Sequence, residues 1–386
     1  MRNVMAHRIH DVGTSIFSEM SALATRHGAV NLGQGFPDFA GPAFLKEAAR
    51  AAISADLNQY APSHGLPVLR SALARTYGPL YGRELDVDRE ITVTSGGTEA
   101  IMVSVLALVN PGDEVILLEP YYDSYPANVL AAGGVPRHVR LREPDWTLNP
   151  DELRAAITPR TRVIMLNTPH NPTGKVFSRA ELELVAQLAR EHDLVVISDE
   201  VYERLVFPPA EHVPLCTLPG MWERTVTILS AGKTFSVTGW KVGYAVASAA
   251  LTEALRRVHQ FCTFATATPL QAAVAAGLEA GEGYLAEFRA FYTARRDELV
   301  TALSDVGFRV RPPQGTYFVM ADYRGLGGEG DLEFCRRLIR EVGVAAIPPS
   351  AFFHDGHQTG HVRFCFAKQP QTLAAAAERL RKLTRA

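Results

Sequence analysis

The sequence predicts an α/β fold in which helices cover both faces of a mostly parallel sheet, followed by a smaller α+β domain. From about residue 85 to 250, short β-rich runs alternate with helical segments, as in parallel sheets. After about residue 285 the pattern changes to a long helix, then short strands and further helices. The chain has 386 residues, 47% of them hydrophobic, which is enough for one large and one small domain.

We expect three parts along the chain: an N-terminal arm that belongs with the small domain (1–40), a large domain (41–285) and a small C-terminal domain (286–386). The small domain should contain a long helix that ends near Ser304 and a helix that begins at Asp331. Short strands and a terminal helix complete it. The expected strands of the large domain are the apolar runs at 91–94, 114–118, 163–166, 194–197 and 225–229.

Two helix starts in the large domain have clear capping signals. Asn149 precedes Pro150, which combines an N-cap residue with proline at the first helical position. Ser178 lies three residues before Glu181, which is the spacing of a capping box. We therefore expect helices to begin at these two points.

The composition argues against several classes of function. The chain has 39 Lys and Arg against 41 Asp and Glu, so its net charge of −2 does not favour nucleic acid or an anionic membrane as a partner. No apolar stretch has the length of a membrane span or the form of a signal peptide. The four cysteines form no Cys-x-x-Cys pair, which indicates the free thiols of a cytoplasmic protein.

Glycine or polar residues follow each expected strand. Because ligands of parallel α/β sheets bind at the carboxyl ends of the strands, these segments form the expected site. The first, residues 95–98 (Ser-Gly-Gly-Thr), leads into a helix whose N–H groups could hold a phosphate. The second contains Tyr121 and Tyr122, whose rings could stack on a flat ligand. Taken singly, an ordinary turn and core tyrosines explain both segments equally well.

The third and fourth segments add an amide and carboxylates. Residues 167–174 contain two prolines and a glycine, and the side chain of Asn171 in this loop could hold a ring oxygen. The fourth segment, residues 198–202, contains Asp199 and Tyr202. A carboxylate at the end of an apolar strand is costly to bury without a cationic partner, so Asp199 could face a protonated ring nitrogen. The alternative is an aspartate that caps a helix.

The fifth segment contains Lys233, directly after the run 225–229. Burial there would lower the pKa of its amine, as a Schiff-base lysine requires. The Gly-Lys-Thr triplet also belongs to a nucleotide-binding loop, but that motif needs a glycine at the position of Thr227. A solvated loop lysine is the remaining alternative. Ser230 and Lys241 are further donors for a phosphate.

Together these segments supply an amine for an aldehyde, a carboxylate for a pyridinium nitrogen, an aromatic ring, and donors for a phenolic oxygen and a phosphate. Pyridoxal 5'-phosphate (PLP) requires this combination. Each feature is ambiguous alone, but their joint placement after five strands predicts a PLP site.

The motifs that carry a family resemblance are residues 31–39, 58–60, 171–177, 198–202, 230–243 and 361–366. Through them the chain resembles the fold-type I PLP-dependent aminotransferases of class I/II over nearly its whole length. It is most similar to the group of kynurenine aminotransferase, glutamine transaminase K and cysteine-S-conjugate β-lyase, with bacterial methionine aminotransferases close by. The resemblance implies a seven-stranded sheet in the large domain, a homodimer, and transfer of an amino group to a 2-oxoacid by a ping-pong mechanism.

The resemblance also implies roles for individual residues. Lys233, Asp199 and Tyr202 are the implied catalytic residues: Lys233 is the Schiff-base lysine and proton carrier, and Asp199 pairs with the pyridine nitrogen. Tyr122 stacks on the ring, and Asn171 holds the phenolic oxygen together with Tyr202. The implied phosphate ligands are Gly97, Thr98, Ser230 and Lys241, with Tyr60 of the partner subunit. The family pattern further predicts cis peptide bonds before Pro120 and Pro172.

The implied substrate is an apolar, aromatic, or sulfur- or amide-bearing L-amino acid of the Met, Gln, Phe or kynurenine type. Arg363 would bind its α-carboxylate, helped by Asn171 and the Gly35 backbone, while Phe17 and Phe264 would line the pocket.

The sequence departs from the family pattern at this pocket. Mammalian kynurenine-type enzymes usually have Tyr at the position of Thr98 and His at that of Ala265, and often Trp at that of Phe17. The pocket should therefore be roomier, which argues against kynurenine itself.

Two sequence patterns point to other ligands, but their context argues against them. Residues 325–330 match a dinucleotide-binding fingerprint, yet the next expected strand, 344–347, ends in two prolines with no acid for a ribose. His354, His357 and His361 have metal-like spacing, but no acidic or cysteine residues around them suggest a defined geometry. We expect neither NAD nor a metal ion.

Two alternative functions share the predicted site. β-Elimination from cysteine conjugates would use the same residues, so residue content does not separate it from transamination. A PLP-sensing transcription regulator would need a DNA-binding domain, but only about forty residues precede the family match and they are not basic.

Overall fold

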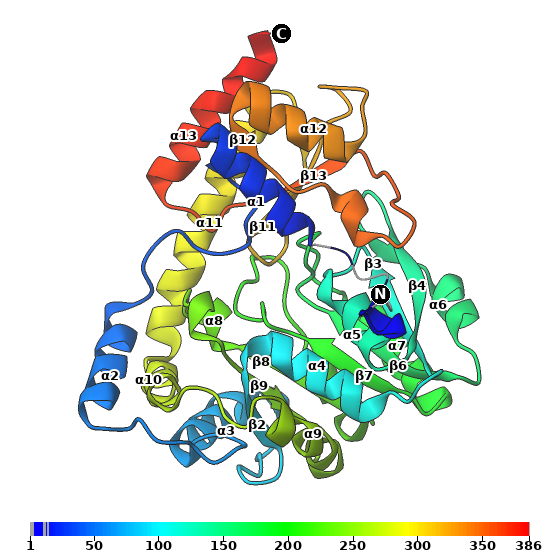
Figure 1. The fold of residues 1–386 in the computed structure, drawn as a ribbon, viewed down its shortest axis with the longest axis vertical. Coiled ribbons are helices and arrows are strands. Elements are labelled where there is room, and N and C mark those ends of the chain that lie inside the picture. The colour runs from blue at the N-terminus through cyan, green and yellow to red at the C-terminus, as the bar shows by residue number, and fades with distance from the viewer. Residues whose placement is uncertain (1–3, 11–12, 14, 386) are drawn as a thin grey trace.

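The structure is a computed structural model that describes residues 4–10, 13 and 15–385 (Figure 1). Parts of the predicted N-terminal arm, residues 1–3, 11–12 and 14, lie outside the described residues, as does Ala386. Among the described helices, none has the length and apolar character that crossing a bilayer demands.

The largest element is an eight-stranded, mostly parallel sheet with the strand order β2-β9-β8-β7-β6-β3-β4-β5. Strands β4, β3, β6, β7 and β8 are parallel, whereas β9 runs antiparallel between β2 and β8. The strands are β2 (Ile91–Ser95), β3 (Glu114–Glu119), β4 (Val135–Arg142), β5 (Thr147–Leu148), β6 (Thr161–Asn167), β7 (Val195–Asp199), β8 (Thr225–Ser230) and β9 (Val242–Val246).

This sheet confirms the predicted fold class. All five expected strands are present, and the seven longer strands match the implied seven-stranded sheet. The two-residue strand β5 adds an eighth at the edge, antiparallel to β4. Strand β4 alternates partly exposed and buried residues because it lies near that edge, so its sequence lacks the continuous apolar run of its neighbours.

Helices cover both faces of the sheet because neighbouring strand residues point in opposite directions. Val115 of β3 packs in one core with Ile101 of α4, and the adjacent Ile116 packs in another with Leu182 of α7. The helices of this part are α2 (Ala43–Ser54), α3 (Pro67–Tyr81), α4 (Gly96–Leu108), α5 (Ser124–Ala131), α6 (Pro150–Ala156), α7 (Arg179–Glu191), α8 (Ala231–Thr234), α9 (Ala249–Cys262) and α10 (Thr268–Leu278).

Both predicted helix starts are confirmed. The Asn149 side chain accepts hydrogen bonds from the backbone N–H groups of Asp151 and Glu152 at the start of α6. At the start of α7, Ser178 and Glu181 form a complete capping box. These side chains satisfy N–H groups that have no partner within the helix.

The second part of the fold combines a segment from near the N-terminus, residues 16–31, with the C-terminal part of the chain, residues 281–380 (Figure 1). Strand β1 near the N-terminus pairs in parallel with β12, and β10, β11 and β13 form an antiparallel sheet. Helix α11 links this part to the large sheet. The elements are α1 (Ile16–His27), β1 (Val30–Asn31), α11 (Gly281–Asp305), β10 (Arg309–Val310), β11 (Phe318–Asp322), α12 (Asp331–Arg337), the π-helical turn η5 (Leu338–Val342), β12 (Val344–Ala345), β13 (His361–Cys365) and α13 (Pro370–Leu380).

Short 3₁₀ turns connect several of these elements. The two that matter for the sites below are η4, before β9, and η6, before β13. The turns are η1 (His7–Ile9), η2 (Leu215–Thr217), η3 (Trp222–Arg224), η4 (Thr238–Trp240), η6 (Pro349–Phe352) and η7 (Arg381–Arg385).

Candidate active site

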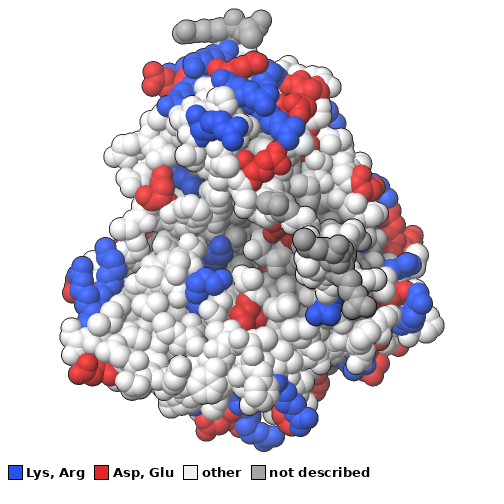
Figure 2. Space-filling view, in the orientation of Figure 1, with Lys and Arg blue, Asp and Glu red and all other residues white. Residues whose placement is uncertain are grey.

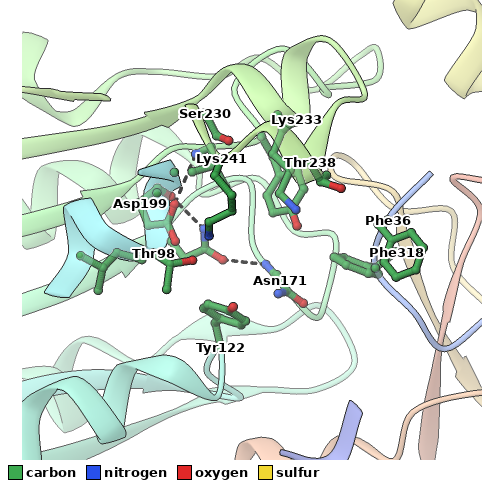
Figure 3. Close-up of a pocket in the computed structure, with 18 of the residues that line it drawn as sticks. Phe36, Thr98, Tyr122, Asn171, Asp199, Ser230, Lys233, Thr238, Lys241 and Phe318 are labelled. Carbon is green, nitrogen blue, oxygen red and sulfur yellow. Dashed lines mark hydrogen bonds between the residues drawn. The ribbon is translucent and has the colours of Figure 1, made fainter. Parts of the chain in front are cut away.

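The segments that follow β2, β3, β6, β7 and β8 line one cavity of about 270 Å³. Residues Gly35 and Phe36, after β1, and Arg363 of β13 close its other side. The cavity lies at the hollow in the middle of the face shown in Figure 2, with charged residues of both signs around it. Figure 3 shows Tyr122 entering the cavity from the side opposite Ser230 and Lys233. The strand ends therefore converge as predicted from parallel-sheet geometry.

Lys233 lies in the short helix α8, directly after β8. Its Nζ donates a hydrogen bond to the Tyr317 hydroxyl at 2.8 Å, and that hydroxyl donates to the Gly35 carbonyl at 2.6 Å. Burial lowers the pKa of Lys233 to about 8, although the nearby Asp199 charge opposes the shift. A substantial fraction of the amine is therefore neutral at mildly alkaline pH, which a nucleophilic lysine requires.

Asp199 is the last residue of β7 and is buried. Burial raises the pKa of its carboxyl to about 6, while a hydrogen bond from the Tyr125 hydroxyl to Oδ2, at 2.6 Å, lowers it. The Val201 N–H group donates weakly to Oδ1 at 3.3 Å. The carboxylate is therefore ionised at neutral pH, and its hydrogen-bond donors are neutral. A cation such as a protonated ring nitrogen would compensate this buried charge.

The loop after β6 connects this carboxylate to the opposite side of the cavity. Asn167 donates from Nδ2 to the Asp199 carbonyl at 2.8 Å, and the N–H group of Asn171 donates to Asn167 Oδ1 at 2.7 Å. Asn171 Oδ1 in turn accepts from Arg363 at 2.7 Å. The predicted cis peptide bonds before Pro120 and Pro172 are both present.

The start of helix α4 forms a cradle of backbone N–H groups beside a cation. Gly243 of β9 packs directly against the start of α4: a Cβ atom at Gly243 would lie 2.5 Å from Gly96 C and 2.6 Å from Gly97 N. Lys241, just before β9, approaches the same point, and among the described residues it has no carboxylate within ion-pair distance. Thr98 and Ser230 line the cavity beside it. N–H groups, hydroxyls and an uncompensated ammonium suit a phosphate.

Arg363 is fully buried, and each hydrogen-bond partner that it has is neutral. Its Nη1 donates to Asn171 Oδ1 at 2.7 Å and its Nη2 to the Gly33 carbonyl at 3.0 Å. Nε is buried without a partner among the described residues. Burial lowers the pKa of Arg363 to about 10, so the group stays charged at neutral pH. The free donor and the uncompensated charge are what a carboxylate ligand would satisfy.

An aromatic wall surrounds this guanidinium. Its carbon lies 4.0 Å from the ring centroid of Phe318, 4.9 Å from that of Phe17 and 5.5 Å from that of Phe352. Tyr202 also lines the cavity, and burial raises the pKa of its hydroxyl, which therefore remains a donor.

The structure brings most of the predicted site residues together. Two do not line the cavity of a single chain: Tyr60 and Phe264 are 85% and 46% exposed, and their rings contact each other at 5.4 Å. The predicted residues that do line it are Phe17, Gly35, Gly97, Thr98, Tyr122, Asn171, Asp199, Tyr202, Ser230, Lys233, Lys241 and Arg363.

Two tyrosines that contact Asp199 and Lys233 were not predicted from the sequence. Tyr125 bonds to Asp199, and Tyr317 bonds to Lys233. For Tyr125 a signal existed, because it lies only three residues after Tyr122, and the two rings contact each other at 5.6 Å. Tyr317 gave no local signal, since it is 84 residues from Lys233. Phe36, Thr238 and Phe318 also line the cavity.

The cavity fits PLP: burial lowers the pKa of the Lys233 amine, the Asp199 carboxylate is ionised, and the N–H cradle adjoins Lys241, which has no carboxylate partner among the described residues. The fold and this site define a fold-type I PLP-dependent enzyme. Residues 28–380 match the family described as aminotransferase class I and II, so the chain belongs to that family and is an aminotransferase, a transferase of nitrogenous groups.

Similar proteins cover nearly the whole chain. Methionine aminotransferase of Escherichia coli is 44% identical over 97% of both chains. Human kynurenine–oxoglutarate transaminase 1 is 42% identical, over 99% of this chain and 98% of its own. The solved structure of N-succinyldiaminopimelate aminotransferase from Mycobacterium tuberculosis matches with a TM-score of 0.95 and 46% identity, over 98% of this chain and 100% of that one. These matches confirm the predicted resemblance.

Proposed function

We propose that this aminotransferase takes its amino group from an apolar, aromatic, or sulfur- or amide-bearing L-amino acid such as Met, Phe or Gln, and passes it to a 2-oxoacid by a ping-pong mechanism. The observation that carries this proposal is the charge of the cavity. Its cations among the described residues are Lys233, Lys241 and Arg363, which suit an aldehyde, a phosphate and an α-carboxylate respectively. Among the described residues that line the cavity, no cation remains for a second carboxylate, and the aromatic wall favours an uncharged side chain.

The names of two relatives support the same substrate class, since one is a methionine aminotransferase and the other a kynurenine–oxoglutarate transaminase. The third relative acts on N-succinyldiaminopimelate, which carries additional carboxylates. The β-lyase alternative gains no support from these relatives, all of which have aminotransferase names.

Each proposed residue has a task that its surroundings support. Arg363, with the Gly35 backbone and Asn171, would bind the α-carboxylate and so place the Cα–H bond near Lys233. Bound PLP supplies an electron sink, and Asp199 would keep its ring nitrogen protonated. Lys233 would then carry the proton from Cα, because its pKa of about 8 allows both gain and loss of a proton.

Other residues would hold the cofactor without transferring a proton. Tyr122 would stack on the ring, and Tyr202 would donate to the phenolic oxygen together with Asn171. The phosphate would be held by Gly97, Thr98, Ser230 and Lys241.

We also propose a homodimer in which Tyr60 and Phe264 complete the site of the other subunit. In one chain these two side chains form an exposed aromatic pair outside the cavity. Phe261, three residues before Phe264 along the chain, is also 86% exposed. Exposed aromatic patches of this kind favour burial against a partner.

The domain division and the cellular location are also proposals. We propose that residues 41–285 form the large domain, which the arm 1–40 and residues 286–386 accompany as the smaller one; pairing of β1 with β12 supports this division. We also propose a reducing location such as the cytoplasm, which the four free cysteines support.

A steady-state screen of amino donors tests the substrate class. With one 2-oxoacid, we expect Met, Phe or Gln to exceed aspartate and N-succinyldiaminopimelate in kcat/KM by at least about tenfold, because an unpaired carboxylate would be desolvated. Kynurenine should rank below Met. A higher kcat/KM for a dicarboxylic donor would contradict the proposal, and release of pyruvate and ammonia from a cysteine conjugate faster than transamination would favour the β-lyase alternative.

A further inference from the structure

Three potential metal ligands converge outside the cavity. Glu119 ends strand β3, His138 lies in the adjacent strand β4, and His354 follows the turn η6. Glu119 Oε1 lies 3.3 Å from Nδ1 of His138 and 3.0 Å from Nδ1 of His354. The two imidazoles stack in parallel, with centroids 4.3 Å apart and planes inclined by 7°. Both Nδ1 atoms therefore face the same carboxylate oxygen.

Hydrogen bonding alone does not satisfy this arrangement. Oε1 of Glu119 already accepts the backbone N–H of His354 at 2.6 Å and contacts its Nδ1 at 3.0 Å. Nδ1 of His138 is buried and has no hydrogen-bond partner among the described residues. A carboxylate oxygen has two lone pairs, so a third donor is left over. Nδ1 of His138, buried beside a carboxylate and a second imidazole, is therefore available to bind a metal ion.

The spacing of these atoms suits a metal ion. Zinc bonds to nitrogen and oxygen at about 2.0 to 2.2 Å, which places tetrahedral ligand atoms about 3.3 Å apart. The two Nδ1 atoms lie 3.0 and 3.3 Å from Glu119 Oε1, close to that value, and the three ligand atoms lie within 4.8 Å of one another. Because an imidazole lone pair lies in the plane of its ring, at least one of the two parallel rings has to tilt out of the stack for both to bind one ion.

We propose that Glu119, His138 and His354 bind a divalent transition-metal ion of the zinc class, such as Zn²⁺ or Co²⁺, with water at the open positions. Two imidazoles select such ions over Mg²⁺ and Ca²⁺, which prefer oxygen ligands. The half-exposed His354 gives the ion and its water access from solvent.

The ion would fasten the segment after η6 to the large sheet (Figure 1). That segment already contacts β4 and its neighbours: the Tyr121 N–H donates to the Phe352 carbonyl at 3.0 Å, and Arg140 pairs with Asp355 at 2.8 Å. Phe352 belongs to the aromatic wall around Arg363, although no metal ligand lines the cavity. The ion therefore acts as a structural cross-link and takes no part in the chemistry.

The test uses the holoenzyme, first freed of metals with a chelator. We expect Co²⁺ to give visible d–d absorption and Zn²⁺ to bind with one ion per chain in the presence of excess Mg²⁺, with a higher Tm. Failure of Zn²⁺ and Co²⁺ to bind stoichiometrically would overturn the proposal. The PLP absorption should stay unchanged, because the site is separate from the cavity.

Variants assign the ligands. His138→Phe and His354→Phe keep a ring in the stack but remove a ligand, so each should lower Zn²⁺ affinity by at least tenfold. His357→Phe is the matched control, because that imidazole lies in the same segment near Glu143, at 3.7 Å, and should leave affinity unchanged.

Full Zn²⁺ affinity in both ring variants, or an equal loss in the control, would refute the assignment. Glu119→Gln retains a hydrogen-bond acceptor without the charge and should also lose the ion. If a ring variant fails to fold, Glu119→Gln provides the test instead. Unchanged Zn²⁺ binding by Glu119→Gln would count against the proposal.

Discussion

At the scale of single residues, the chemistry depends on Lys233 and Asp199. Burial brings the pKa values of these two residues closer together. Burial lowers the pKa of Lys233 to about 8 and raises that of Asp199 to about 6. Opposite shifts have one cause, because burial disfavours the charged form of either group. Between about pH 6 and pH 8 the lysine ammonium and the aspartate carboxylate are both charged, so each charge partly stabilises the other.

We predict that Lys233→Ala abolishes transamination while the fold is retained. Lys233 supplies the amine whose pKa burial lowers beside Asp199, so without it kcat should fall to background. Circular dichroism and Tm would report the fold, and exposed Lys382→Ala is the control. Full turnover by Lys233→Ala without an added amine would contradict the assignment.

The pKa of Lys233 predicts how fast the PLP-free protein takes up PLP. Its amine attacks an aldehyde only when neutral, so the uptake rate should rise about tenfold per pH unit below pH 8 and level off above it. Asp199 does not limit this range because it is ionised above about pH 6. Stopped-flow absorbance would measure the profile, and a rise that continued to pH 10 would show an unshifted lysine.

Tyr125→Phe should weaken PLP binding and move its acid limit to higher pH. The lost hydrogen bond stabilises ionised Asp199, so its pKa would rise above about 6 and more of it would be protonated at pH 6 to 7. A hydrogen bond to a charged group contributes about 1.5–3 kcal/mol, which corresponds to at least tenfold in affinity. Tyr81→Phe is the control, since its buried hydroxyl has no partner among the described residues. Equal Kd values for both variants would count against this role.

The residues that could be predicted are those with a local sequence signal. Residues that act through tertiary contacts could not be predicted. Asp199 and Lys233 were predictable because each follows an apolar strand, and parallel strands end at one edge. Tyr317 and the pair His138 and His354 meet their partners only after folding, across separations that no local pattern records.

At the scale of elements, the contact between β9 and α4 positions the phosphate cradle. We predict that Gly243→Ala lowers PLP affinity more than tenfold, because a Cβ atom 2.5 Å from Gly96 C must displace the start of α4. Gly239→Ala in the preceding turn η4 is the control, since its Cβ would meet nothing within 4 Å. Equilibrium dialysis of PLP would compare the two variants, and equal affinities would mean that the cradle tolerates the shift.

Helices and strands were predictable where the sequence carries a clear apolar run or a clear capping signal. The five strands and the two capped helices follow from apolar runs and capping residues. Strand β4 was not located because it lies near the sheet edge, where its exposed positions include Arg137 and Arg142. Strand β9 is short and apolar, but nothing in its own residues shows that it runs antiparallel.

At the scale of the whole molecule, the proposed dimer makes a prediction about mixed subunits. Tyr60→Ala and Lys233→Ala should each be strongly impaired, yet co-expression should restore activity. In a mixed dimer, the Lys233→Ala chain supplies Tyr60 to the other chain, whose Lys233 is intact. Random pairing would give about a quarter of the wild-type sites. Absence of restored activity in purified mixed dimers would show that Tyr60 acts within its own chain.

The buried guanidinium of Arg363 has a final consequence for selectivity. Its hydrogen-bond partners are a carbonyl and an amide, and its neighbours are aromatic rings, so the positive charge is compensated only when a ligand brings an anion. A decarboxylated analogue, such as phenylethylamine in place of phenylalanine, would leave that cation desolvated and unmatched. The enzyme should therefore reject monoamines even when their side chains fit, and so leave a cell's pool of free amines untouched.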